Sequence, residues 1–297
     1  MKDVVGIIGQ GFVGSAINET FSQYYNVLTY DKDPSKETTF DNVSDLMRRV
    51  DNEYSTGVVF LCLPTPMKRS GECDLSIVRS VMQEIQDSFS TRYTMSHTRK
   101  PIVVIKSTVP PGTTAQFNKD YGLVDTVFNP EFLTEANAKE DFKNLKRIIL
   151  GGPRPATTRL KTMYRKVFAS VPIIKTGSNS AEMVKYFTNC FLATKVSFAN
   201  EMKQICDEYN IDYDKVTEYA LYDERIGPTH LSVPGPDGKL GFSGSCFPKD
   251  INALRFYAQA AGIDTQTMDG AWKKNLEVRP ERDWEKLVGR AISEEIE

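Results

Sequence analysis

A glycine pattern near the start of the chain restricts the fold more than any other feature. Val4–Ile8 is a short apolar run that leads into Gly9-Gln10-Gly11-Phe12-Val13-Gly14, a match to GxGxxG, and residues 12–23 follow a helical pattern. In such a unit the first glycine permits a tight turn, the second lets the backbone approach a pyrophosphate, and the third allows close helix packing. The helix N-terminus offers N–H groups to phosphate. The predicted cofactor-binding residues of this turn are Gly9, Gly11, Phe12, Val13 and Gly14.

An acidic residue at the end of the next apolar run supports this prediction. Residues 26–31 have the pattern of a second strand, and Asp31 closes it. A carboxylate there accepts hydrogen bonds from a ribose diol and repels a 2′-phosphate, so the pattern favours NAD over NADP. Lys32, the next residue, weakens that preference slightly. The alternative, in which the glycines only build a turn, is disfavoured by this context.

Further apolar runs continue the pattern of strands alternating with helices. They occupy residues 58–63, 102–105, 124–128, 147–150 and 171–174. Continuous apolar strands that alternate with helices are typical of a parallel sheet covered on both faces. The sequence therefore predicts an α/β fold with an N-terminal Rossmann domain, a doubly wound parallel sheet that binds NAD, over residues 1–176.

The pattern becomes helical after residue 176. Asn179 followed by Glu182 matches a capping box, and no proline or glycine interrupts the chain from there to residue 209, so one long helix is expected. The segments expected after it are a helix over 213–223, a Gly/Pro-rich loop over 227–244, and helices over 250–261 and 284–291. Residues 177–297 are thus predicted to form the long connecting helix and a small all-helical domain that carries the cysteine loop.

Composition excludes several classes of function. The 297 residues include 37 basic and 39 acidic side chains without a long run of either sign, so no nucleic-acid or membrane footprint is expected. No apolar run approaches the ~18 residues of a membrane span. Five cysteines, an odd number, and no secretory signal favour reduced thiols in a cytoplasmic protein. With two histidines and no CxxC or HExxH pattern, no metal site is expected.

One thiol lies in a glycine-rich turn beside a lysine and an aspartate, in the segment Gly241-Phe242-Ser243-Gly244-Ser245-Cys246-Phe247-Pro248-Lys249-Asp250. A nucleophilic cysteine reacts as the thiolate, and Lys249 together with a helix start after Pro248 would lower the pKa of Cys246. The remaining thiols are interpreted as small buried apolar residues, as most free cysteines are. They are Cys62, Cys73, Cys190 and Cys206. The sequence predicts covalent catalysis at Cys246.

Two polar residues stand four apart on the predicted long helix. Lys185 and Asn189 therefore fall on one face, within about 6 Å of each other, and can serve one substrate atom. Apolar residues surround them, so the lysine by itself is more readily interpreted as extending its amine past an apolar surface to water. Glu131 and Glu135 are also four apart; two nearby carboxylates tend to raise one pKa, which suits general-base work, although an exposed acidic helix start is the ordinary interpretation.

Six separated motifs occur in the order seen in nucleotide-sugar dehydrogenases. They are Gly9 to Gly14, Leu61-Cys62-Leu63-Pro64-Thr65-Pro66, Ser107-Thr108-Val109-Pro110-Pro111-Gly112-Thr113-Thr114, Asn129-Pro130-Glu131-Phe132-Leu133-Thr134-Glu135, Lys185 to Asn189, and the Cys246 segment. Because these motifs spread over about 240 residues, chance agreement is very improbable. The chain resembles the UDP-glucose/GDP-mannose dehydrogenase family.

The resemblance implies a chemistry and roles for these residues. Members of this family oxidise a primary alcohol to a carboxylate by successive NAD reductions, through a thiohemiacetal and a thioester on the cysteine, which here is Cys246. Lys185 would stabilise oxyanion character and assist proton transfer with Asp250, and Asn189 would donate a hydrogen bond to the same oxygen. Glu131 and Thr108 would position the hydrolytic water.

Further residues are assigned by the same resemblance. The implied substrate-binding residues are Glu135, Arg225, Lys249, Phe242 and Gly244. Pro64, Thr65 and Thr108 would add to the cofactor site. Arg225 suits bidentate contact with an anion, possible also across a dimer interface, although surface arginines commonly have no such role. Ser243 and Ala136 occupy positions where the family usually has glycine, and Ser243 would restrict the cysteine loop if its φ must be positive.

The expected reaction is the oxidation of UDP-glucose to UDP-glucuronate. GDP-mannose or UDP-N-acetylmannosamine are alternative substrates, because the motifs serve the shared chemistry. By the resemblance this chain is a short form that lacks the C-terminal nucleotide-covering domain of typical members, which motivates a further alternative, a non-catalytic NAD-binding protein. A homodimer is also expected from the resemblance.

Overall fold

The computed structural model describes residues 2–50, 57–90 and 100–294. Its contacts divide the chain into two compact units. The first comprises residues up to Thr65 together with Leu75–Lys185, and the second comprises Pro66–Asp74 together with the residues from Tyr186 onward. The predicted division at residue 176 stays a prediction.

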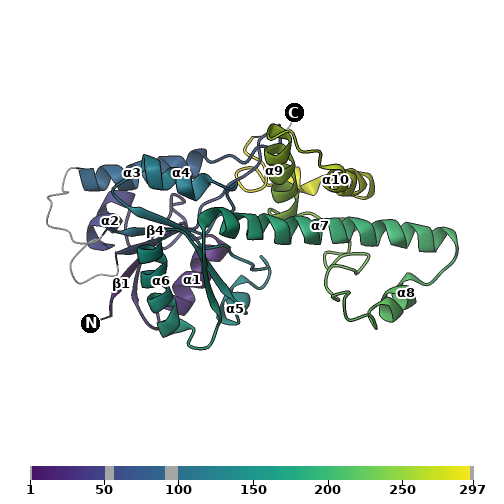
Figure 1. Cartoon of the computed structure of the whole chain (residues 1–297), viewed down its shortest axis with the longest axis horizontal. Coiled ribbons are helices and arrows are strands. Elements are labelled where there is room, and N and C mark those ends of the chain that lie inside the picture. Colours follow the sequence, from purple (N-terminus) through teal and green to yellow (C-terminus); the bar gives the residue numbers. More distant parts are fainter. Residues whose placement is uncertain (1, 51–56, 91–99, 295–297) are drawn as a thin grey trace. The chain divides into compact units, whose positions relative to one another are not determined.

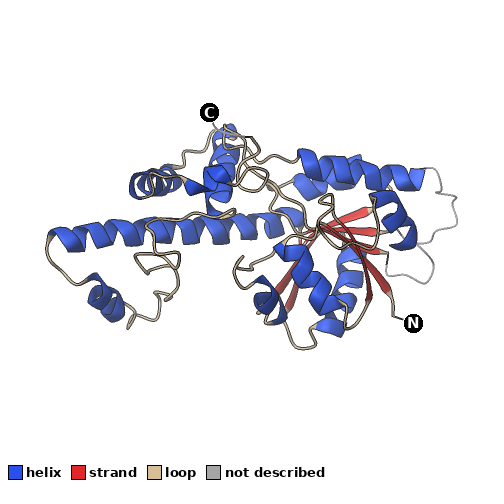
Figure 2. Ribbon diagram, turned by 180° about the vertical axis from the view of Figure 1, so that it is seen from behind, coloured by secondary structure: helices blue, strands red, loops and turns tan. Residues whose placement is uncertain are grey.

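The first unit is built on a seven-stranded sheet. Its strands are β1 (Val4–Ile8), β2 (Asn26–Tyr30), β3 (Val58–Leu61), β4 (Ile102–Ile105), β5 (Asp125–Phe128), β6 (Ile148–Gly151) and β7 (Ile173–Thr176). They follow the order β2-β1-β3-β4-β5-β6-β7. Neighbouring strands are parallel except for β5 and β6, which are antiparallel. The predicted doubly wound, mainly parallel sheet is confirmed, with one reversal near its end (Figure 2).

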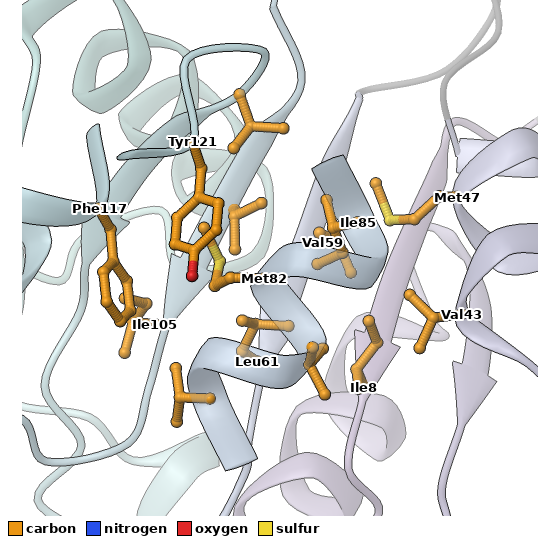
Figure 3. Close-up of a cluster of buried hydrophobic side chains, with 14 of the residues drawn as sticks. Ile8, Val43, Met47, Val59, Leu61, Met82, Ile85, Ile105, Phe117 and Tyr121 are labelled. Carbon is orange, nitrogen blue, oxygen red and sulfur yellow. The ribbon is translucent and has the colours of Figure 1, made fainter. Parts of the chain in front are cut away.

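Helices cover both faces of this sheet (Figure 1). One face carries α1 (Phe12–Phe21), α5 (Ala138–Lys143) and α6 (Arg154–Val167), and the other carries α2 (Val43–Val50), α3 (Ser76–Ser90) and α4 (Thr113–Asp120). Alternation along β1 feeds both cores, because Val5 and Ile7 join one cluster while Ile8 joins the other. Figure 3 shows Ile8 between α2 and α3. Each such side chain contributes roughly 1.5–3 kcal/mol when fully buried.

The strand order places a ligand crevice at β1. Strand β2 lies on one side of β1 and β3 on the other, so the direction of winding reverses there. In open α/β sheets ligands bind at the carboxyl ends of the strands at such a switch point. Gly9 follows β1 and Cys62 follows β3, and their N–H groups donate to Tyr30 and Ile8 at 2.8 Å. The glycine turn therefore lies where this fold binds ligands.

The long helix runs from one unit into the other. Helix α7 spans Ser178–Glu208, close to the range predicted for it. The second unit adds α8 (Tyr213–Ala220), α9 (Phe247–Ala260), α10 (Gln266–Val278) and a short 3-10 turn, η1 (Asp283–Lys286). Of the helices in the described residues, none combines the length and apolar character that a bilayer crossing needs.

Two helix predictions in the C-terminal part are wrong. The predicted helix over 284–291 is only the one-turn η1, and α10 was not predicted. Asp269-Gly270 inside α10 is a turn signal in the local sequence, yet buried contacts of Ala271 and Asn275 keep the segment helical. Tertiary packing overrides local propensity here.

The predicted capping box is also wrong. Helix α7 starts at Ser178, so Asn179 is already inside it. The carboxylate of Glu182 instead accepts hydrogen bonds from the N–H groups of Gly112 at 2.7 Å and Thr114 at 2.8 Å. Glu182 thus caps the start of α4 rather than that of its own helix.

Candidate active site

Sterics fix the glycine turn at its first and third glycines. Gly9 has φ +94°, and a Cβ there would overlap the carbonyl of Cys62. A Cβ on Gly14 would overlap the carbonyl oxygen of Gly9. Around Gly11, in contrast, a Cβ would meet nothing within 4 Å. The protein's own backbone requires Gly9 and Gly14, whereas Gly11 leaves room for a ligand at the N-terminus of α1.

The N-terminus of α1 fits a phosphate group. Gly11 is its N-cap, and no side chain of the described residues caps it, so its N–H groups face the open space. Phe12 and Val13 form the first helical turn and are partly exposed. Asp31 lies beside this turn, where its carboxylate accepts from the N–H of Gln10 at 2.5 Å and of Asp33 at 2.8 Å. This arrangement fits a dinucleotide with a free ribose diol.

The loops that follow β3 and β4 are joined by hydrogen bonds. The Ser107 hydroxyl donates to the carbonyl of Leu63 at 2.5 Å, and the N–H of Leu63 donates to the Ser107 hydroxyl at 3.1 Å. The Thr65 hydroxyl donates to the carbonyl of Thr108 at 2.8 Å. Thr65 and Thr108 are buried, whereas Pro64 is exposed. These contacts bring the predicted residues of the two loops to one edge of the sheet.

Glu182 holds the second of these loops in place. It is fully buried, and burial raises its pKa despite its bonds to Thr114 and Gly112. The sequence pattern assigned it to a capping box and missed this contact. Only the fold, which brings α7 against α4, identifies its partner.

Lys185 and Glu131 form a buried ion pair in the first unit. The Lys185 amine lies 3.0 Å from the Glu131 carboxylate and 2.6 Å from its backbone oxygen, and the side chains are 3% and 8% exposed. Lys185 therefore does not extend to water as the simpler interpretation had it. Burial would raise the pKa of Glu131, but the charge of Lys185 outweighs it and lowers that pKa. The predicted upward shift from a Glu131–Glu135 pair is wrong, because residue 131 is not helical and Glu135 is exposed.

Lys106 is a second buried cation near this pair. It is 4% exposed, and its amine donates to the Asn129 side chain at 2.9 Å. The Tyr164 hydroxyl donates to the same Asn129 oxygen at 2.5 Å. Burial lowers the pKa of Lys106 to about 8. Sequence reasoning did not single out Lys106; a lysine that directly follows the wholly apolar strand β4 was the available signal.

In the second unit, polar contacts converge on Asp250. Asn189 donates to one carboxylate oxygen at 2.6 Å, and the Lys249 amine donates to the other at 2.5 Å. Asp250 is 1% exposed. Burial alone would lower the pKa of Lys249, yet the Asp250 charge outweighs it and raises that pKa. Cys246 is the N-cap of α9, and its carbonyl accepts from the N–H of Asp250 at 2.9 Å.

The environments of the thiols differ. Cys246 is partly exposed at the start of a helix, whereas Cys73, Cys190 and Cys206 are buried. Burial raises the pKa of Cys62 to about 12, which keeps that thiol neutral. A thiol at a helix N-terminus with a neighbouring lysine is in the setting that favours the thiolate.

The turn before Cys246 has ordinary backbone at its serine. Its left-handed residues are Gly241 (φ +68°) and Gly244 (φ +76°), while Ser243 is not among the positive-φ residues. The predicted restriction at Ser243 therefore does not arise. Phe242 is buried and packs edge-on against Phe247, with ring centroids 6.0 Å apart.

Arg225 lies apart from this cluster within the second unit's loops. Its side chain is 89% exposed, and its guanidinium binds the carboxylate of Asp223 through contacts of 2.5–3.1 Å. An arginine held in this way presents a fixed donor at the surface.

Comparisons with known proteins agree with this geometry. Residues 44–170 match the NAD binding domain of the UDP-glucose/GDP-mannose dehydrogenase family, and residues 179–277 match its central domain. The UDP-glucose 6-dehydrogenase of Haloferax volcanii is 32% identical over 94% of this chain and 70% of the relative. That of Bacillus subtilis is 31% identical over 93% of this chain, which spans 63% of the relative's length.

A solved structure shows the same architecture. The UDP-glucose dehydrogenase from Pyrobaculum islandicum aligns with a TM-score of 0.81 at 28% identity, over 93% of this chain and 68% of that one. The glycine turn, the NAD-binding domain and the central domain with its cysteine turn thus occur together. The chain belongs to the UDP-glucose/GDP-mannose dehydrogenase family.

Proposed function

We propose that this chain oxidises the primary alcohol of a nucleotide sugar to a carboxylate, and that the substrate is UDP-glucose, which yields UDP-glucuronate. The proposal rests on one observation above others: Asn189 and Lys249 both bind Asp250, one helical turn from Cys246. The names of the relatives from Haloferax and Bacillus favour UDP-glucose. GDP-mannose and UDP-N-acetylmannosamine remain the alternatives within the family.

Cys246 carries the proposed covalent steps. Bound NAD supplies the hydride acceptor, with about two molecules reduced per sugar. Once the alcohol has lost a hydride and a proton, the Cys246 thiolate adds to the aldehyde carbon and forms a thiohemiacetal. Loss of a second hydride leaves a thioester, and water then displaces the thiolate to release the carboxylate. Lys185 stabilises the oxyanion and assists proton transfer with Asp250, and Asn189 donates to the same oxygen.

Glu131 and Thr108 are assigned to the hydrolytic water. The lowered pKa of Glu131 keeps its carboxylate charged near neutral pH, so it can accept a proton from water as a general base. Thr108 orients that water. The proposed sugar-nucleotide contacts come from Glu135, Arg225, Lys249, Phe242 and Gly244.

The yield of NADH tests this proposal. With limiting UDP-glucose and excess NAD, about two NADH should form per sugar nucleotide, because the alcohol is carried to the carboxylate. Parallel reactions with GDP-mannose and UDP-N-acetylmannosamine identify the preferred substrate. Cys246→Ser should lose at least about a thousandfold in rate, since the hydroxyl is a far weaker nucleophile than the thiolate. A protein that binds NAD but reduces it with none of these sugars would instead be a non-catalytic binder.

A homodimer is the proposed assembly. On α7 the side chains of Phe187, Phe191, Phe198 and Ile205 are 69%, 61%, 59% and 45% exposed. Their spacing of four and seven residues places them on one helix face, and the Phe187 and Phe191 rings stack at 6.3 Å. A second copy of this chain would bury that stripe. Sedimentation should give a dimer that Phe191→Glu converts to a monomer; a monomeric wild type contradicts it.

A cytoplasmic location is proposed with the same standing. Five free thiols suit a reducing compartment. Cell fractionation with an antibody to the chain would check it.

A further inference from the structure

The residues that precede Cys246 are anchored by a helix far along the chain. Asn275 of α10 is fully buried, and its side chain both accepts from the N–H of Phe242 at 2.7 Å and donates to the Phe242 carbonyl at 3.0 Å. The N–H of Gly241 donates to the Asn200 side chain on α7 at 3.2 Å. Gly241 cannot be replaced, since a Cβ there would overlap the Asn275 carboxamide. Two buried amides thus satisfy the backbone of this turn.

A buried arginine anchors the residues on either side. Arg279 is 2% exposed, and its guanidinium donates to the Leu240 carbonyl at 3.1 Å and to Asp237 at 2.6 Å. It also binds the Asp283 carboxylate at 2.6 and 3.0 Å. The hydroxyl of Ser243 donates to the same carboxylate. Hydrogen bonds from Arg279 hold the pKa of Asp283 well below its usual range, so this acceptor stays charged.

These contacts end just before the nucleophile. Residues 240 to 243 each have a hydrogen bond to this network, and only Gly244 and Ser245 separate them from Cys246. On the far side Phe242 packs against Phe247, the first residue of α9. Anchors therefore lie on both sides of the thiol.

We propose that Asn275 and the Arg279–Asp283 pair are positioning residues for Cys246, and that Ser243 couples the turn to that pair. Buried ion pairs are weak evidence for a stability role, because apolar side chains of similar size often stabilise as well. What these groups supply is direction, since each bond aims a particular backbone or hydroxyl group. Ser243 stands where the family usually has glycine, so its bond to Asp283 is a feature of this chain. The inference rests on the proposed role of Cys246.

The test uses the full chain with variants of graded severity. Asn275→Ala removes the double contact with Phe242, Asp283→Asn weakens the ion pair, and Ser243→Ala removes only a hydroxyl. Ser243→Thr restores the hydroxyl and is the rescue variant. Glu277→Gln is the matched control, because Glu277 also lies on α10 but binds Lys274 and Gln204 instead of the turn.

Three readouts separate positioning from general stability. Amide hydrogen exchange in residues 240–246 should rise about tenfold in Asn275→Ala and Asp283→Asn, the scale of a lost buried hydrogen bond, and stay unchanged in peptides from the β1–α1 region. The rate of Cys246 alkylation by iodoacetamide at pH 7, followed by peptide mass spectrometry, should fall about threefold because the sulfur moves from the Lys249 amine. With UDP-glucose, kcat should fall about tenfold while the KM for NAD is unchanged.

Each outcome decides the inference. Local exchange and slower alkylation in the three test variants, with wild-type behaviour in Ser243→Thr and Glu277→Gln, support it. Unchanged Cys246 alkylation in all of them, or exchange that rises equally across the chain, overturns it. A wild type that reduces no NAD would overturn the proposed function alone, because exchange and alkylation are read without turnover.

Discussion

The glycine turn and the cysteine turn are fixed by different physics. In the glycine turn, Gly9 and Gly14 are demanded by backbone atoms within the first 62 residues of the chain. In the cysteine turn, Phe242 and Ser243 are held by side chains 33 and 40 residues further on. Close backbone packing leaves a local mark in the sequence, whereas polar anchoring does not. This contrast explains why one turn was predicted in detail and the other only by its reactive residues.

Replacing Gly14 is the severest way to test the steric side of the comparison. Gly14→Ala places a methyl group on the carbonyl of Gly9, so the strand, turn and helix must separate. We expect a loss of more than about 4 kcal/mol in the free energy of unfolding, or no folded protein. Urea titration followed by circular dichroism measures it. Near wild-type stability would remove the steric basis of the turn.

Removing the charge of Asp250 tests the polar side. Asp250→Asn leaves the buried Lys249 without its counter-ion, and breaking such a pair typically costs roughly 3 kcal/mol. The matched control is Asp207→Asn, which breaks the exposed Lys203–Asp207 pair and should be nearly neutral. The same urea titration applies. Equal effects for the two variants would show that burial does not distinguish these pairs.

Gly11→Ala separates ligand binding from folding within one turn. The added methyl group meets open space, so unfolding should change by less than about 0.5 kcal/mol. It occupies the place where a pyrophosphate approaches the backbone, so NAD affinity should fall about tenfold. Isothermal titration with NAD checks the second effect. Unchanged affinity would place the cofactor elsewhere.

The smallest effect concerns Lys106 and pH. Its pKa falls from 10.5 to about 8 on folding because burial disfavours the charged amine. Between these values the unfolded chain binds more protons than the folded one, so this residue makes stability rise as pH increases from about 8 to 10.5. Lys106→Met should remove that rise. Parallel curves of unfolding midpoint against pH for the two proteins would contradict it.

Much of the fold was predictable because its cause is local. The apolar strands, the glycine turn and the long helix α7 all follow from patterns within short windows. Helix α10 was missed because Asp269-Gly270 signals a turn and only the buried Asn275 and Ala271 outweigh it. Glu182 was assigned to the wrong helix, since its partners lie about 70 residues earlier in the chain.

The candidate site was predictable as a set of residues and not as a set of contacts. Motif order gave Lys185, Asn189, Cys246 and Asp250, and the structure adds that Asn189 and Lys249 both bind Asp250. The downward pKa shift of Glu131 could not be foreseen, because it depends on which charge the fold brings beside it. Charge partners are a property of tertiary structure.

The central claim is that Cys246 carries a partly oxidised sugar as a covalent intermediate. Acid quenching during turnover with UDP-glucose and NAD, followed by mass spectrometry of the Cys246 peptide, tests it most directly. The account predicts a thioester adduct of UDP-glucuronyl mass on this peptide. Accumulation of UDP-glucuronate with no adduct at any time, and at an unchanged rate in Cys246→Ser, would contradict it.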